Sequence, residues 1–211
     1  MSLKFKIYPR KSFVHFTHVK IKNNFIPIEI LCVMGEKSTL DWIPDFSLSW
    51  SDFQAESNPA IFEDSHSVIK YRFTWTVNSD KIDDDIVFLI ENISLFVEFH
   101  PLLSWVRSSE ANDSLLCHQQ GNFDLAELVK RENLIKLQEK FYKRHFSTRG
   151  QNEEQQKQFA KEDSGKMINK EVEQLQNIFD EKSLKYQNKT NYGKNVEEQS
   201  KYDLIFKQLR S

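Results

Sequence analysis

The chain has 211 residues, with 29 Lys and Arg against 31 Asp and Glu, so it carries no strong net charge to attract nucleic acid or acidic lipid. Its charge is uneven, because residues 1–110 hold 11 basic and 15 acidic side chains, whereas residues 111–211 hold 18 and 16. Cys32 and Cys117 are too few for a disulfide framework and unsuited to a zinc site. No apolar run reaches the roughly 18 residues of a membrane span. These features predict a soluble protein inside the cell, in the cytoplasm or the nucleus.

The first half of the chain has the patterns of β-structure. Apolar runs separated by turn signals predict strands at 13–21, 25–34, 46–50 and 68–77, and two more within 85–99. A turn near Glu91 and Asn92 is expected between those last two strands. Alternation in the run 68–77 places one set of side chains on one face, namely Ile69, Tyr71, Phe73, Trp75 and Val77. Because no helices alternate with these strands, the pattern predicts an antiparallel β-sandwich over residues 1–107.

The second half has a different composition. All five prolines and all four tryptophans precede residue 106, so we expect a linker over residues 108–122. Residues 123–149 contain no Pro or Gly and repeat apolar residues at helical spacing, which predicts an amphipathic helix packed on the sandwich or on a partner. Residues 150–211 are predicted to form a polar, partly disordered α-helical tail.

Two short segments of this tail, 171–186 and 202–209, keep apolar residues at helical spacing in a polar context. Such segments are typical of helices that become ordered on a partner protein. The residues predicted to bind this partner are Val172, Leu175, Ile178, Phe179, Leu204, Ile205, Phe206 and Leu209.

Several motifs follow one another in a familiar order. EILCVMGEKSTLDWIPDFSLSW, residues 29–50, reads as strand, loop and strand, and ESNPAIFED, residues 56–64, has an Asn-Pro turn followed by an aromatic and an acidic residue. FTWTVNSDKIDDDIVF, residues 73–88, then places four aspartates between two apolar runs. In this order they resemble a C2 domain over about residues 25–130. The resemblance implies an eight-stranded sandwich that binds lipid head groups or peptides, with a calcium site at Asp41, Asp45, Asp80 and Asp84.

The acidic run around Asp80 has two interpretations. Calcium takes six to eight oxygen ligands, and carboxylates converging from two loops would supply them. A solvated turn between two strands shows the same residues, because aspartate readily caps its own backbone. Asn78 stands where a C2 domain has its first aspartate, and the turn is therefore the favoured interpretation.

The stretch KFYKRHFSTR, residues 140–149, interleaves basic and aromatic side chains. It predicts a surface for a polyanion such as nucleic acid or acidic lipid, formed by Lys140, Lys143, Arg144 and Arg149. The preferred alternative is the basic end of a helix whose aromatic residues face the core.

These patterns lead to three functional hypotheses. The favoured one is a non-catalytic adaptor or scaffold subunit, whose β-body docks in an assembly and whose tail recruits other subunits or a second copy of the chain. The second is a peripheral module that binds lipid, with calcium as its cofactor, and the third is a scaffold associated with chromosomes or nucleic acid. Enzymatic activity is not expected, because the sequence contains no glycine-rich phosphate loop and no nucleophile motif.

Overall fold

The structure is a computed structural model, and it describes residues 39–60, 62–82 and 85–211. The chain divides into two units, Met1–Met34 and Gly35–Ser211, and every described residue belongs to the second unit. The predicted strands at 13–21 and 25–34 therefore lie outside the described residues.

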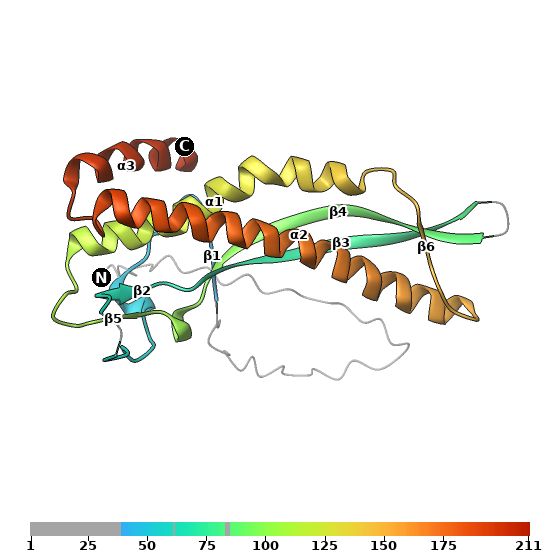
Figure 1. The fold of residues 1–211 in the computed structure, drawn as a ribbon, viewed down its shortest axis with the longest axis horizontal. Helices are drawn as coiled ribbons and strands as arrows, with labels where there is room; N and C mark the ends of the chain where they lie inside the picture. Colours follow the sequence, from blue (N-terminus) through green and yellow to red (C-terminus); the bar gives the residue numbers. More distant parts are fainter. Residues whose placement is uncertain (1–38, 61, 83–84) are drawn as a thin grey trace, which may run out of the picture. The chain divides into compact units, whose positions relative to one another are not determined.

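The described chain has short and long strands in its first half and three α-helices in its second half (Figure 1). The strands are β1 (Leu40–Asp41), β2 (Ser65–His66), β3 (Ile69–Ile82), β4 (Asp85–Phe99), β5 (Trp105–Val106) and β6 (Phe146–Ser147). The helices are α1 (Asp113–Phe141), α2 (Glu153–Thr190) and α3 (Val196–Arg210), and two short 3-10 helices are η1 (Trp50–Asp52) and η2 (Pro101–Leu103).

β3 and β4 form one long antiparallel hairpin, which begins with the pair Ile69 and Phe99 and ends with the pair Ile82 and Asp85. Side chains alternate along β3, so that every second residue from Ile69 to Val77 is buried or half-buried and the residues between them are exposed. The predicted apolar face of this strand is thus confirmed. The opposite face is polar, and there Arg72 pairs with Glu98 at 2.5 Å.

The turn expected at Glu91 and Asn92 is wrong, because β4 continues through these residues with a β-bulge. Thr74 pairs with Ser94 and Thr76 pairs with Glu91, so one residue of β3 lies opposite two residues of β4. Asn92 has a φ of 52°, in the left-handed region that asparagine tolerates. The extra residue shifts the alternation. Before it, Phe88 and Ile90 are buried together with the adjacent Val87, and after it the odd-numbered residues from 93 to 99 are buried.

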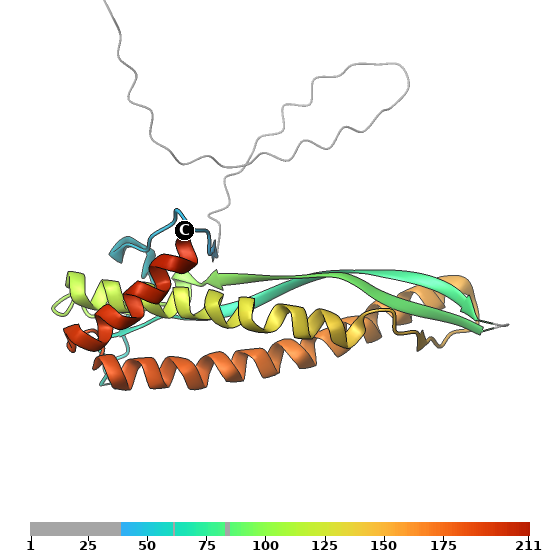
Figure 2. The same cartoon turned by 90° about the horizontal axis from the view of Figure 1, so that it is seen from above.

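The helices cover one face of the hairpin. α1 packs along β4, α2 packs along β3, and both helices contact each other and α3. Figure 2 shows α1 and α2 on the same side of the hairpin. The core runs between these layers, and its fully buried side chains come from the sheet and from both long helices, as with Phe99, Phe123, Val129, Ile168 and Tyr186.

Each helix begins after an asparagine whose side chain accepts a hydrogen bond from a backbone N–H of the first turn. The three caps are Asn112 for α1, Asn152 for α2 and Asn195 for α3. Asparagine satisfies donors that have no partner within the helix. Because α1 begins at Asp113, directly after its cap Asn112, most of the range 108–122 forms the first turns of a helix and is not the predicted linker.

The range 150–211 also differs from the predicted disordered tail, since it consists of α2 with 38 residues and α3 with 15 residues. The polar first half of α2 is held to the body of the chain by small and apolar residues at helical spacing. Ala160, Ser164 and Ile168 are four residues apart and all buried. A narrow buried stripe is therefore enough to order a segment that is polar on its other faces.

The antiparallel β-structure of the first half is confirmed, but the sandwich is not. Within the described residues, β1, β4 and β3 form a sheet that β6 extends by pairing with β4, and β2 pairs with β5 in a separate sheet. These sheets are not closed. The resemblance to C2 domains therefore stays a prediction.

Candidate functional site

An apolar cavity lies between the far half of the hairpin and the first turns of α2, and we call it the hairpin groove. Its volume is about 860 Å³. The apolar side chains that line it are Phe73, Trp75, Val77, Ile86, Val87, Phe88 and Ala160. Cavities of about 300–1,000 Å³ with such a lining are the usual size of sites for drug-sized ligands.

Contacts between the hairpin and its neighbours fix the walls of the hairpin groove. Trp75 Nε1 donates a hydrogen bond to Ser164 Oγ of α2 at 2.9 Å. Gly165 lets the indole lie directly on α2, because a Cβ atom at this position would be 3.2 Å from Trp75 Cζ2. On β4, Phe88 stacks on Phe146 of β6 with ring centroids 5.4 Å apart. The groove is therefore formed by packed elements and not by a loop.

Charged side chains line the groove beside its apolar surface. Glu153 pairs with Lys157 at 2.6 Å, and an oxygen of Asp80 lies 3.4 Å from His145 Nε2. Lys161 also lines the groove and is exposed, and within the described ranges no carboxylate forms an ion pair with it. The groove thus offers an apolar surface and one lysine, Lys161, that has no ion-pair partner among the described residues.

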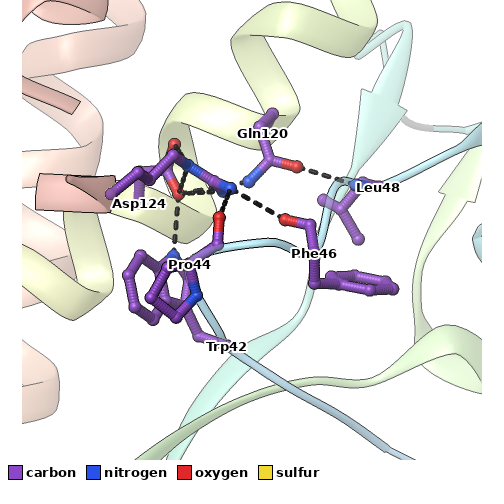
Figure 3. Close-up of polar contacts among 7 residues, drawn as sticks. Trp42, Pro44, Phe46, Leu48, Gln120 and Asp124 are labelled. Carbon is purple, nitrogen blue, oxygen red and sulfur yellow. Dashed lines mark hydrogen bonds and ion pairs between the residues drawn. The ribbon is translucent and has the colours of Figure 1, made fainter. Parts of the chain in front are cut away.

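A buried polar site joins the end of the chain to the segment before β2, and we call Trp42, Asp124 and Arg210 the C-terminal clamp. Asp124 is 3% exposed and accepts hydrogen bonds from Trp42 Nε1 at 2.7 Å and from Arg210 Nε at 3.0 Å. Figure 3 shows Trp42 and Gln120 beside Asp124, the carbonyl groups of Pro44 and Phe46 nearby, and the backbone N–H of Leu48 donating to Gln120. Arg210 Nη1 donates to the carbonyl oxygens of Pro44 and Phe46 at 2.9 and 2.8 Å. Because these partners all belong to the chain itself, the clamp has a structural role.

His118 lies at the junction of α1, α2 and α3 and is fully buried. Its ring stacks on Tyr186 with centroids 4.6 Å apart, and its Nδ1 lies 3.2 Å from Thr190 Oγ1. Burial lowers the pKa of His118 from its ordinary value to about 4. The neighbouring Cys117 has a raised pKa, chiefly because of burial, which keeps its thiol protonated. His118 therefore has the properties of a core residue rather than of a base, and Cys117, which is exposed, lacks the lowered pKa of a nucleophile.

The structure does not bring the predicted calcium ligands together. In the strand register, Asp41 lies opposite Glu98 of β4 near the beginning of the hairpin, and Asp80 lies opposite Val87 of β4 near its end. Val87 and Glu98 are eleven positions apart in β4, which corresponds to roughly 35 Å along a strand. Asp45 follows β1 in the chain, and Asp84 lies outside the described residues. Among the residues that are described, no group of three or more His, Cys, Asp or Glu is placed to hold a metal ion.

The predicted partner-binding residues fall into two sets. Five of them have exposed fractions of only 4–7% and belong to the core, namely Val172, Leu175, Phe179, Phe206 and Leu209. They pack within the chain, and their side chains are not accessible to a partner in this structure. The other three are exposed, with fractions of 38% for Ile178, 66% for Leu204 and 45% for Ile205.

The predicted polyanion surface is partly neutralised within the chain. Lys140 pairs with Glu171, and Arg149 pairs with Asp163 at 3.1 Å. The two remaining cations lie over aromatic rings, with Lys143 Nζ 5.2 Å from the Tyr142 centroid and Arg144 Cζ 5.5 Å from the Phe146 centroid. The stretch therefore has the properties of a basic helix end more than those of a charged groove.

The sequence indicated some residues of these sites, but not their arrangement. Phe73, Trp75 and Val77 were expected on one apolar face, and their place beside a cavity depends on α2, which begins 76 residues after Val77. Asp124 and Arg210 are 86 residues apart, and no local pattern connects them.

None of the helices in the described part of the chain is both long and apolar enough to span a bilayer. No protein-family model matches the chain, and neither the curated proteins nor the solved structures include a significant match.

Proposed function

We propose that this chain is a non-catalytic adaptor subunit of an intracellular multiprotein assembly, and that it holds a partner protein in the hairpin groove. The observation that carries the proposal is the apolar cavity of about 860 Å³ between the hairpin and α2. Large apolar surfaces that remain accessible on a folded protein commonly mark interaction sites.

The packing around the groove supports this role. α1 and α2 back the hairpin along most of its length, and the hydrogen bond from Trp75 to Ser164 joins the sheet to α2 beside the cavity. A groove with fixed walls binds a partner with little loss of conformational entropy. In this proposal the site therefore lies on the hairpin and α2, and the exposed side chains of Ile178, Leu204 and Ile205 are at most a second contact.

The pKa shifts of His118 and Cys117 also favour a binding role over a catalytic one. A general base works best with a pKa near the operating pH, whereas burial lowers the pKa of His118 to about 4. A nucleophilic cysteine needs a lowered pKa, whereas that of Cys117 is raised.

The lipid and nucleic-acid hypotheses have less support. A C2-like calcium site requires converging carboxylates, and Asp41 and Asp80 lie at opposite ends of the hairpin. A polyanion site requires unneutralised cations, and Lys140 and Arg149 already have acidic partners.

Two variants at neighbouring positions of β3 test the adaptor proposal. Val77 is half-buried in the hairpin groove, and Asn78 is exposed on the opposite face, where it donates a hydrogen bond to Glu91. Val77→Lys places a charge in the groove, whereas Asn78→Lys places the same charge beside an acidic residue in solvent. We expect proteins that copurify with the full-length chain from its own cells to be lost with Val77→Lys and retained with Asn78→Lys.

Thermal unfolding of both variants establishes first that each one folds. Equal recovery of all partners with Val77→Lys and with the wild type would show that the groove is not the docking site. A chain that copurifies with no other protein would contradict the adaptor role itself.

A further inference from the structure

Among the strands that the structure describes, β3 lies at an edge of its sheet, and the direction of its peptide groups follows from contacts at its beginning. Within the described residues, β3 pairs only with β4. His100 N–H donates to the carbonyl of Val68 at 2.9 Å, so the peptide groups of Val68 point toward β4. Because successive residues of a strand point in opposite directions, those of Ile69 point away from β4. The contact of Gln176 Nε2 with the Ile69 carbonyl at 3.2 Å agrees with this direction.

The same alternation continues along β3. Odd-numbered residues direct their N–H and C=O groups to the outer edge, and in the far half of the strand these are Phe73, Trp75, Val77 and Ser79. All four also line the hairpin groove. No described residue forms a hydrogen bond with their outward backbone groups. An unpaired edge of this kind is a template for another strand.

We propose that the partner binds as an extended segment that adds to the outer edge of β3, with every second side chain in the hairpin groove. This inference rests on the proposed adaptor function and specifies the chemistry of the partner. In strand addition, main-chain hydrogen bonds provide affinity, and pockets for alternate side chains provide specificity. A segment of about seven residues spans the edge from Phe73 to Ser79.

The groove also defines which side chains this segment carries. Its lining by Trp75 and Val77 requires apolar residues at every second position of the segment. The ammonium of Lys161, which has no ion-pair partner in the described part of the chain, favours an acidic residue near the α2 side of the groove. The partner is therefore an extended, mildly acidic segment with alternating apolar residues.

The first experiment selects such segments directly. A phage-displayed library of random peptides of about 12 residues, longer than the edge itself, is panned against the full-length chain and counter-selected with the Val77→Lys variant. We expect the enriched peptides to share apolar residues at every second position. Failure to enrich any peptide, or enrichment of peptides without this alternation, would overturn the proposal.

The second experiment distinguishes strand addition from other ways of filling the groove. Ser79→Pro removes one outward N–H and places a ring at the edge while leaving the bonds to β4 intact, and Ser79→Ala keeps the N–H as a matched control. We expect Ser79→Pro to weaken binding of the best enriched peptide by about tenfold, as the loss of a backbone hydrogen bond requires, and Ser79→Ala to change it less than about twofold.

Amide hydrogen exchange provides the decisive pattern. On binding of the enriched peptide, the amides of Trp75, Val77 and Ser79 should become protected, whereas those of Thr76 and Asn78, which point toward β4, should not change. Protection of the odd-numbered amides in the chain without peptide would contradict the proposal, because the edge is then already occupied. If Val77→Lys abolishes binding but Ser79→Pro does not, the groove is the docking site and only the strand mode is wrong.

Discussion

His118 is a fully buried imidazole, and its pKa is lowered from near 6.5 to about 4 because burial disfavours the charged ring. In the unfolded chain the same ring binds a proton below about pH 6.5. The contribution of His118 to stability is therefore complete above this pH and is lost as the pH falls from 6.5 toward 4. Between pH 7 and pH 5, this group alone should lower the free energy of unfolding by about 2 kcal/mol.

His118→Phe tests this dependence because phenylalanine can still stack on Tyr186 but cannot take up a proton. Urea unfolding of the wild type and the variant at pH 7 and pH 5 gives the loss of stability for each protein. We expect the wild type to lose about 2 kcal/mol more than the variant over this interval. An equal loss in both proteins would show that His118 is not buried as a neutral ring.

Replacement of Arg210 tests how much the C-terminal clamp contributes to the stability of the folded chain. The side chain of Arg210 is 19% exposed, and the side chain of Asp124, whose carboxylate it contacts, is 4% exposed. Arg210→Met leaves this carboxylate buried without its cation, which should cost about 3 kcal/mol in the free energy of unfolding. The same substitution at Arg149, whose side chain is 60% exposed in its pair with Asp163, should cost at most about 1 kcal/mol.

Chemical denaturation of both variants at neutral pH measures these two costs. Similar losses for Arg210→Met and Arg149→Met would mean that the C-terminal clamp contributes no more than a surface ion pair.

At the scale of elements, the bulge in β4 determines which side chains of the far hairpin face the helices. Asn92 has the φ of 52° that allows the bulge, and its Nδ2 donates to Thr76 Oγ1 at 3.0 Å. Glycine adopts this conformation without strain, whereas a β-branched residue does not. We expect Asn92→Gly to change the free energy of unfolding by less than about 1 kcal/mol and Asn92→Val to lower it by about 2 kcal/mol.

Ser94→Val is the matched control for the bulge, because Ser94 is an exposed residue of the same strand in a regular pair with Thr74. Valine is favourable in strands, so this variant should be neutral or slightly more stable. If Asn92→Val and Ser94→Val had the same stability by thermal unfolding, the left-handed conformation of Asn92 would be refuted.

The elements of the chain differ in how far the sequence predicts them. Strict alternation from Ile69 to Val77 predicted the inward face of β3 because one regular period continues without interruption. The polar pair Glu91 and Asn92 has the composition of a turn, and only the pairing with β3 shows that the strand continues as a bulge. The first half of α2 was missed because its buried stripe contains Ala160 and Ser164, which carry little hydrophobic signal.

Contacts between residues that are distant in sequence could not be predicted, because no local pattern indicates them. Gly121 lies within α1, where glycine normally weakens a helix. A Cβ atom at this position would be 2.1 Å from the hydroxyl oxygen of Tyr186, so the glycine is required by a side chain of α2. The hairpin groove likewise depends on contacts distant in sequence, since one wall comes from the hairpin and the other from α2.

At the scale of the whole molecule, the structure makes the last helix part of the core, whereas the sequence predicted a tail that is ordered only by a partner. Phe206 and Leu204 separate these alternatives, because both were predicted to bind a partner but their exposed fractions are 4% and 66%. Phe206→Ala should lower the free energy of unfolding of the isolated chain by about 4 kcal/mol, since it removes a ring packed on Tyr186. Leu204→Ala should change it by less than about 0.5 kcal/mol.

The readout for these two variants follows the entire chain and not α3 alone. Tryptophan fluorescence reports on Trp42 in the C-terminal clamp and on Trp75 beside the hairpin groove, and far-ultraviolet circular dichroism reports on the helices. If α3 belongs to the core, Phe206→Ala shifts both transitions by the same amount, because loss of its ring destabilises the sheet and the helices together. If the tail is ordered only when a partner binds, the fluorescence transition of Phe206→Ala keeps its wild-type midpoint. Phe206→Ala and Leu204→Ala would then have the same unfolding transitions.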